Sequence, residues 1–168
     1  METKLFFGSS PGNTEKCAKK IAAELGSLIA EMKDVKKASV DDFDFVDGFI
    51  IGLSTVDEGL LQEDWRRFWD DIEDVDFEGK TVALFGLGDQ VKYGKWFVDA
   101  IGIVHDKLTS MGAKVVGEWP TDGYTYENTK SVRNGKFVGL VLDVDNQDDQ
   151  TDARIKSWCD QIRPHFGG

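Results

Sequence analysis

Residues 4–25 read KLFFGSSPGNTEKCAKKIAAEL, and this stretch gives the first indication of the fold class. Its first residues, Lys4–Gly8, form a short apolar strand that ends in glycine. In Thr14–Leu25 the apolar residues recur on one face at the helical period. They are Cys17, Ala18, Ile21, Ala22 and Leu25. The stretch therefore predicts a strand, a polar turn and an amphipathic helix, in that order.

The same alternation of strands and helices continues to the end of the chain. Further strands are expected at Leu28–Met32, Phe45–Leu53, Lys80–Leu87, Lys114–Gly117 and Phe137–Leu142. Helices are expected at Gln62–Ile72, Trp96–Met111 and Asp152–Phe166. Strands that alternate with helices of this length indicate βαβ units and a parallel sheet. We expect an α/β fold with a doubly wound five-stranded parallel sheet and helices on both faces, built by residues 1–168 as a single domain.

Composition restricts the partners and the location of the protein. The 168 residues contain 31 acidic and 20 basic residues, a formal net charge of −11. This balance argues against binding to nucleic acid or to an anionic membrane, because phosphate contacts need clustered Lys and Arg. The longest apolar runs are far shorter than a membrane span, and no secretory signal is visible. We expect a cytoplasmic monomer in which Cys17 and Cys159 are buried, without a disulfide or a zinc site.

Three polar segments follow strands of the predicted sheet: Gly8–Thr14, Ser54–Gly59 and Gly86–Gly94. Doubly wound sheets bind ligands outside the carboxyl ends of their strands, where the strand order reverses. Within the third segment, Tyr93 could stack on a flat ring. Each segment alone is also typical of a surface turn, and Tyr93 could equally cover the edge of the core. Their convergence at one end of one sheet is a stronger indication of a binding site than any one of them.

The first segment and its helix start, Gly8–Glu15, read GSSPGNTE and contain hydroxyls, glycines and an amide, but no Lys or Arg. Backbone N–H groups at a helix start, together with Ser and Thr hydroxyls, can hold a phosphate monoester. The segment is neither a Walker motif nor a G-x-G-x-x-G motif, which makes a dinucleotide less favoured. A polar turn with a Ser or Asn cap is the alternative interpretation.

Four stretches together resemble long-chain flavodoxins over essentially the whole chain. They are Gly8–Glu15, GLLQEDW at Gly59–Trp65, LFGLGDQVKY at Leu84–Tyr93, and Gly117–Gln147. The last of them contains the insertion that splits the fifth strand in the long-chain subgroup. The resemblance implies a flavodoxin-like fold, one noncovalently bound FMN, and a role as a low-potential electron carrier rather than as an enzyme.

The resemblance also implies which positions contact FMN. The phosphate loop would comprise Ser9, Ser10, Pro11, Gly12, Asn13 and Thr14. The inner face of the flavin would meet Ser54, Thr55, Val56, Asp57, Glu58 and Gly59. The outer face would meet Leu87, Gly88, Asp89 and the stacking Tyr93, and Trp96 and Phe97 would also contact the cofactor. Asp89 would contact the pyrimidine edge, and Asp145 would approach the ribityl chain.

Three departures from the family pattern stand out. Pro11 replaces a hydroxyl residue and removes a backbone N–H from the phosphate loop. Val56 stands where many relatives have a tryptophan on the inner face. Lys92 and Trp96 are unusual beside Tyr93; we expect Trp96 to cap the following helix, with coverage of the flavin edge as the other interpretation.

Charge and the placement of the histidines bear on mechanism. His105 and His165 lie outside the three segments, and no nucleophile–base pair is visible, so the flavin would supply the chemistry. Asp57, Glu58 and Asp89 would disfavour the anionic reduced ring and lower its potential. From Asp57 to Glu78 there are ten acids and two arginines, and from Asp143 to Asp152 five acids and no base. These stretches predict docking to basic redox partners such as a ferredoxin/flavodoxin-NADP reductase or a downstream reductase, unless they merely form a solvated face.

Three other functions compete with the electron carrier. A phospho-acceptor receiver domain is disfavoured because the third strand ends in Gly52-Leu53-Ser54, without an aspartate. An FMN-dependent quinone or NAD(P)H reductase on the same fold stays open. So does a relative that has lost FMN, which Pro11 and Val56 make conceivable.

Overall fold

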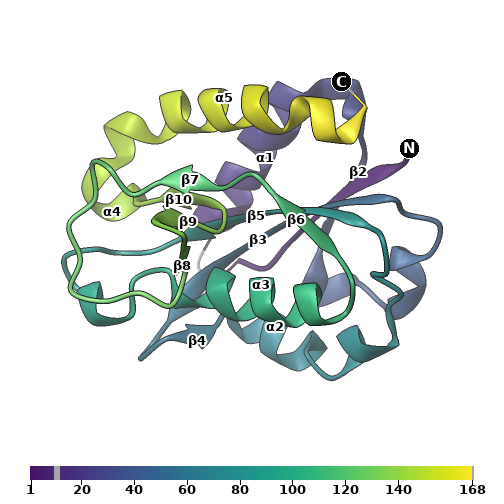
Figure 1. The fold of residues 1–168 in the computed structure, drawn as a ribbon, viewed down its shortest axis with the longest axis horizontal. Helices are drawn as coiled ribbons and strands as arrows, with labels where there is room; N and C mark the ends of the chain where they lie inside the picture. The colour runs from purple at the N-terminus through teal and green to yellow at the C-terminus, as the bar shows by residue number, and fades with distance from the viewer. Residues whose placement is uncertain (10–11, 168) are drawn as a thin grey trace.

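The centre of the molecule is a parallel sheet with strand order β10-β5-β3-β1-β2 (Figure 1). The computed structural model describes residues 1–9 and 12–167. The five strands are β1 (Thr3–Phe7), β2 (Ile29–Asp34), β3 (Gly48–Val56), β5 (Thr81–Leu87) and β10 (Leu140–Leu142). The helices are α1 (Asn13–Leu25), α2 (Glu63–Phe68), α3 (Asp99–Ser110), α4 (Val144–Gln147) and α5 (Thr151–Ile162). The doubly wound α/β fold expected from the sequence is confirmed.

Short 3-10 turns connect many of these elements. They are η1 (Gly26–Leu28), η2 (Val35–Lys37), η3 (Val40–Phe43), η4 (Asp71–Asp74), η5 (Gly94–Trp96), η6 (Asp148–Gln150) and η7 (Arg163–Phe166). No helix in the part of the chain that the structure describes is both long and apolar enough to cross a membrane.

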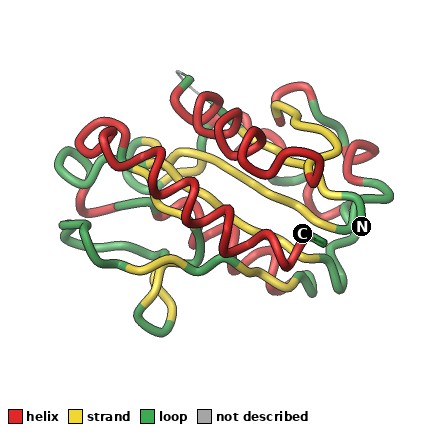
Figure 2. Tube along the Cα trace, turned by 90° about the horizontal axis from the view of Figure 1, so that it is seen from above, coloured by secondary structure: helices red, strands yellow, loops and turns green. Residues whose placement is uncertain are grey.

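Helices cover both faces of the sheet and bury a separate core on each. Helices α1 and α5 lie side by side over one face, as Figure 2 shows from above, whereas α2 and α3 cover the other (Figure 1). Successive side chains of a strand point to opposite faces. In β1, accordingly, Leu5 and Phe7 join the core beneath α1 and α5, while Phe6 joins the other core. Both cysteines are buried in the first of these cores, as expected, and burial raises the pKa of Cys17 to about 11 and that of Cys159 to about 12.

The fifth position of the sheet is shared by two strand pieces. β6 (Lys114–Val116) pairs with Thr81–Ala83 at the beginning of β5, and β10 pairs with Phe85–Leu87 at its end. Between the two pieces, residues 117–139 leave the sheet. They form a small antiparallel sheet of β7 (Trp119–Pro120), β9 (Lys136–Phe137) and β8 (Val132–Arg133), in that order. The fifth strand is therefore split by an insertion, as the resemblance implied.

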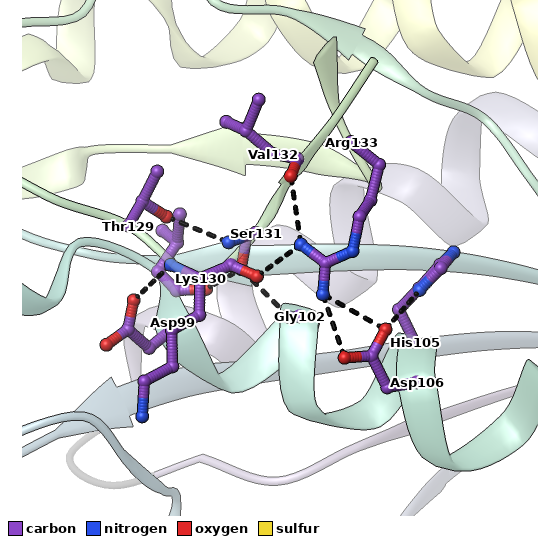
Figure 3. A network of polar contacts seen from close by, with 10 residues as sticks. Asp99, Gly102, His105, Asp106, Thr129, Lys130, Ser131, Val132 and Arg133 are labelled. Atoms are coloured by element: carbon purple, nitrogen blue, oxygen red, sulfur yellow. Dashed lines mark hydrogen bonds and ion pairs between the residues drawn. The ribbon is translucent and has the colours of Figure 1, made fainter. Parts of the chain in front are cut away.

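The insertion is held on α3 by a polar network (Figure 3). The Ser131 hydroxyl accepts a hydrogen bond from Gly102 N at 2.8 Å and donates one to Val98 O at 2.6 Å. The Arg133 guanidinium donates to both carboxylate oxygens of Asp106, at 3.0 and 2.8 Å. A Cβ at position 102 would lie 2.3 Å from Lys130 O, so only glycine permits this close approach. These contacts hold the insertion against α3.

Three helices differ from the expectation by three residues or more at one end. Helix α5 ends at Ile162 and not at Phe166, because the chain continues as the 3-10 turn η7. Helix α2 is shorter than Gln62–Ile72 because Gln62 lies outside it as the N-cap, accepting from Asp64 N at 3.1 Å, and because the chain after Phe68 turns into η4. Helix α3 begins at Asp99 rather than near Trp96, because Val98 has a left-handed backbone with φ 47°. The expectation that Trp96 caps this helix is therefore wrong: Trp96 belongs to the preceding turn η5.

Candidate functional site

A hollow of about 160 Å³ opens where the carboxyl ends of β3 and β5 meet the start of α1. Nearly all of its lining comes from the three segments singled out in the sequence. The lining residues are Asn13, Thr14, Ser54, Thr55, Val56, Leu87, Gly88, Asp89, Tyr93, Val144 and Asp145. The structure thus brings together ten of the predicted contact positions, and Val144 is the one addition.

A second, larger hollow of about 630 Å³ adjoins the first through Tyr93, which lines both. Its other lining residues are Asp57, Glu58, Leu60, Lys92 and Trp96. Tyr93 itself is 37% exposed, so its ring is available to a ligand. Trp96 lies at this end of the site, with its Cβ 3.6 Å from where a Cβ at Gly59 would be. The two hollows together offer a polar end and an end with two aromatic side chains.

The start of α1 forms the polar end of the first hollow. Gly12 is the N-cap residue with φ 147°, and it provides no side-chain cap. The first N–H groups of a helix have no partner within the helix, so those of Asn13 and Thr14 are suited to an anion. Glu15 N donates to Ser9 Oγ at 3.2 Å, which places Ser9 at the same helix end. Ser10 and Pro11 lie outside the described residues.

Strand β3 supplies the hydroxyl groups of the site. It continues to Val56, so Ser54 and Thr55 lie on the strand, whereas the sequence predicted that they lie in the loop after it. The Ser54 hydroxyl is buried and has no hydrogen-bond partner among the described residues. A buried hydroxyl without a partner is costly, and a ligand with a polar group would satisfy it. The Thr55 hydroxyl, by contrast, already accepts from Ala100 N at 2.9 Å in the first turn of α3.

A tight turn follows β3 and carries two exposed carboxylates. β4 (Leu60–Leu61) folds back to pair with Thr55 and Val56. Asp57 has φ 49° and Gly59 φ 88°, both in the left-handed region that such a turn requires. The hairpin therefore fixes Asp57 and Glu58 at the rim of the second hollow.

Asp89 is held by three donors at the other side of the first hollow. It accepts from Lys92 N at 2.8 Å, Val91 N at 3.0 Å and Asn146 Nδ2 at 2.8 Å. Burial works against its charge, but these hydrogen bonds outweigh burial and lower the pKa of Asp89. Burial, followed by the charges of Asp89 and Asp143, raises the pKa of Asp145. In the first hollow, therefore, hydrogen bonds stabilise the charged form of Asp89, whereas burial and neighbouring charges destabilise the charged form of Asp145.

Asp143 organises this side of the site and was missed by the sequence interpretation. It is fully buried and accepts from Gln90 N at 3.1 Å, Gln90 Nε2 at 2.7 Å and Asn146 N at 3.1 Å. Through Gln90 and Asn146 it links the segment after β5 to the segment after β10. Its position directly after β10 was a usable signal, because the ends of the other strands were selected on the same ground.

Phe97 does not have the place that the resemblance implied. It is fully buried, and its ring stacks on Tyr126 at a centroid distance of 5.4 Å. It lines neither hollow. A Cβ at Gly88 would lie 3.1 Å from the Phe97 ring, so Phe97 packs behind Gly88 instead of facing a ligand. We correct its role to support of the segment after β5.

Comparison with known proteins assigns this arrangement to a family. The family model described as Flavodoxin matches residues 5–158. A flavodoxin of Picosynechococcus sp. is 49% identical over 164 residues, which cover 97% of this chain and 96% of that protein. Flavodoxin 2 of Escherichia coli is 48% identical over 164 residues, covering 96% of this chain and 95% of that protein.

A solved structure agrees with these sequence relatives. The crystal structure of Fusobacterium nucleatum flavodoxin bound to flavin mononucleotide superposes with a TM-score of 0.93 at 34% identity, covering 99% of each chain. The chain belongs to the flavodoxin family.

Proposed function

We propose that the protein binds one FMN noncovalently in the two adjoining hollows and carries electrons on it between redox partner proteins. One observation carries the proposal: the backbone N–H groups of Asn13 and Thr14 at the start of α1, the Ser54 hydroxyl, which has no partner among the described residues, and the exposed Tyr93 ring converge on the same hollows. These groups fit a ligand with a phosphate, a polar chain and a flat ring. The FMN-bound F. nucleatum relative supports the same assignment.

Each part of the site has a distinct task toward such a ligand. The N–H groups at the start of α1 favour the phosphate charge, which makes a basic side chain unnecessary there. Tyr93 would stack on the outer face of the ring, and Asp89 and Asp145 would meet its polar edge and chain. Bound FMN supplies the redox chemistry, while these residues bind it, orient it and set the charge around it.

The visible absorption spectrum of the purified protein tests the proposal. We expect a yellow protein that releases FMN on denaturation and recovers its colour when FMN is added back. A colourless protein that cannot be reconstituted would contradict FMN binding. Steady NAD(P)H consumption with a quinone, catalysed by the FMN-loaded protein alone, would contradict the carrier role and favour a reductase.

The carboxylates of the β3–β4 turn are expected to lower the potential of the reduced cofactor. Asp57 and Glu58 line the second hollow, and like charges destabilise an anionic reduced ring. In the double variant Asp57→Asn, Glu58→Gln, we expect the reduced form to bind about tenfold more tightly relative to the oxidised form, with an upward shift of the reduction potential. A spectroelectrochemical titration measures the shift. An unchanged potential would reject the electrostatic account.

The acidic surface beside the site is expected to steer basic redox partners. Nine of the ten acids between Asp57 and Glu78 are exposed; the exception is Asp64. Near them, the second hollow is edged by the exposed apolar residues Leu60 and Tyr93. We expect electron-transfer rates with a basic reductase to fall by roughly tenfold or more from low to high ionic strength. Stopped-flow rates that do not depend on salt would exclude steering.

A further inference from the structure

The two hollows contain one cationic side chain among many carboxylates. Of the described residues that line them, Lys92 alone carries a positive charge. The acidic lining residues are Asp57, Glu58, Asp89 and Asp145. Charges near a redox group shift its reduction potential, so the effect of this cation would oppose that of the four carboxylates.

The segment that follows β5 fixes the position of Lys92. Its backbone N–H donates to Asp89 Oδ1 at 2.8 Å, and its Nζ lies 5.4 Å from the centroid of the Tyr93 ring. The ammonium group forms no ion pair with any carboxylate in the described part of the chain, so no close partner neutralises its charge. The side chain therefore presents an unpaired cation at the ring-binding end of the site.

The field of this cation reaches into the first hollow as well. It contributes to the lowered pKa of Asp89, after the opposing effect of burial and the hydrogen bonds that Asp89 accepts. It also opposes the rise in the pKa of Asp145 that burial and the charges of Asp89 and Asp143 cause. A ligand placed between these carboxylates would feel the same field.

We propose that Lys92 raises the reduction potential of bound FMN by partly offsetting the surrounding carboxylates. This inference rests on the proposed function. In the overall couple, oxidised FMN takes up two electrons and one proton, so the reduced ring carries one negative charge. A nearby cation stabilises that anion more than it stabilises the neutral oxidised ring. Lys92 is thus a positioning and tuning residue and takes no part in a bond-making step.

Three variants separate charge from shape. Lys92→Met keeps most of the stem that lies over Tyr93 and removes the charge, whereas Lys92→Arg keeps the charge. Lys95→Met is the matched control, because Lys95 is an exposed lysine of η5 that lines neither hollow. For each variant, the dissociation constant of oxidised FMN is measured by fluorescence titration and the two-electron midpoint potential by spectroelectrochemistry.

For Lys92→Met we expect the reduced form to bind about tenfold more weakly relative to the oxidised form, which lowers the two-electron midpoint potential by about 30 mV. Lys92→Arg and Lys95→Met are expected to retain the wild-type potential. Added salt should shrink the shift of the Met variant.

Two results would overturn the inference. If Lys92→Met weakened the binding of oxidised and reduced FMN equally, the lysine would not distinguish the two redox forms. If Lys92→Arg lowered the midpoint potential as much as Lys92→Met does, the shape of the lysine and not its charge would matter. A wild-type protein that binds no FMN would instead reject the proposed function itself, so the two failures can be told apart.

Discussion

Replacement of Tyr93 by serine is expected to weaken FMN binding by roughly 5- to 150-fold. The ring lines both hollows and is the best-placed group for stacking on a flavin. Loss of the stack costs about 0.5–1.5 kcal/mol beyond area burial, and loss of the apolar contact costs a similar amount again. Titration of the apo-protein with FMN, followed by the quenching of flavin fluorescence, measures the effect.

Tyr93→Phe is the matched control for this substitution. The Tyr93 hydroxyl has no hydrogen-bond partner among the residues that the structure describes, so the Phe variant should bind FMN nearly as tightly as the wild type does. Since Tyr93 is 37% exposed, neither variant should lower the free energy of unfolding of the apo-protein by much. Wild-type affinity in Tyr93→Ser would show that the ring does not stack on the cofactor.

Replacement of Asp143 by alanine is expected to lower the free energy of unfolding by about 3–5 kcal/mol. The fully buried carboxylate accepts hydrogen bonds from the backbone N–H and the side-chain amide of Gln90 and from the backbone N–H of Asn146. The alanine variant would leave these donors without their acceptor and would open a cavity between two segments of the site. Urea unfolding of the apo-protein, monitored by circular dichroism, measures the loss.

Two further variants make the Asp143 result specific. Asp149→Ala changes an exposed aspartate of η6 and should alter stability by no more than about 0.5 kcal/mol. Asp143→Asn keeps the shape and one acceptor oxygen, so its loss should be smaller than that of the alanine variant. If Asp143→Ala were as stable as the wild type, the hydrogen bonds around Asp143 would not support the site as described.

The order and type of the main strands and helices could be predicted because they follow from hydrophobic periodicity, whereas β4 and α4 are too short to show a period. The boundaries could not be predicted, since they depend on contacts distant in sequence or on single backbone angles. Helix α3 starts late because Val98 adopts φ 47°, which no apolar pattern signals. Residues 117–139 could be recognised only as an insertion, because their place on α3 depends on Ser131 and on the close approach at Gly102.

The candidate site could be predicted where its residues directly follow a strand. The prediction failed where the position of a side chain depends on its packing. Tyr93 and Asp145 line the first hollow because the carboxyl ends of parallel strands meet at one edge of the sheet. Phe97 follows the same segment in sequence, yet the left-handed residue after it and the aromatic side chains of the insertion draw it into the core. Asp143 could have been selected from its position directly after β10, but its hydrogen bonds with Gln90, 53 residues away in sequence, could not be predicted.

One cofactor is expected to bind where the start of α1 and the ends of β3 and β5 converge. The most direct test is a titration of the nitrogen-15-labelled apo-protein with FMN, followed by backbone amide NMR. We expect saturation at one equivalent, with the largest chemical-shift changes at Asn13–Thr14, Ser54–Gly59, Leu87–Tyr93 and Asp145. Shifts centred elsewhere on the molecule, or no shifts at all, would contradict binding at this site.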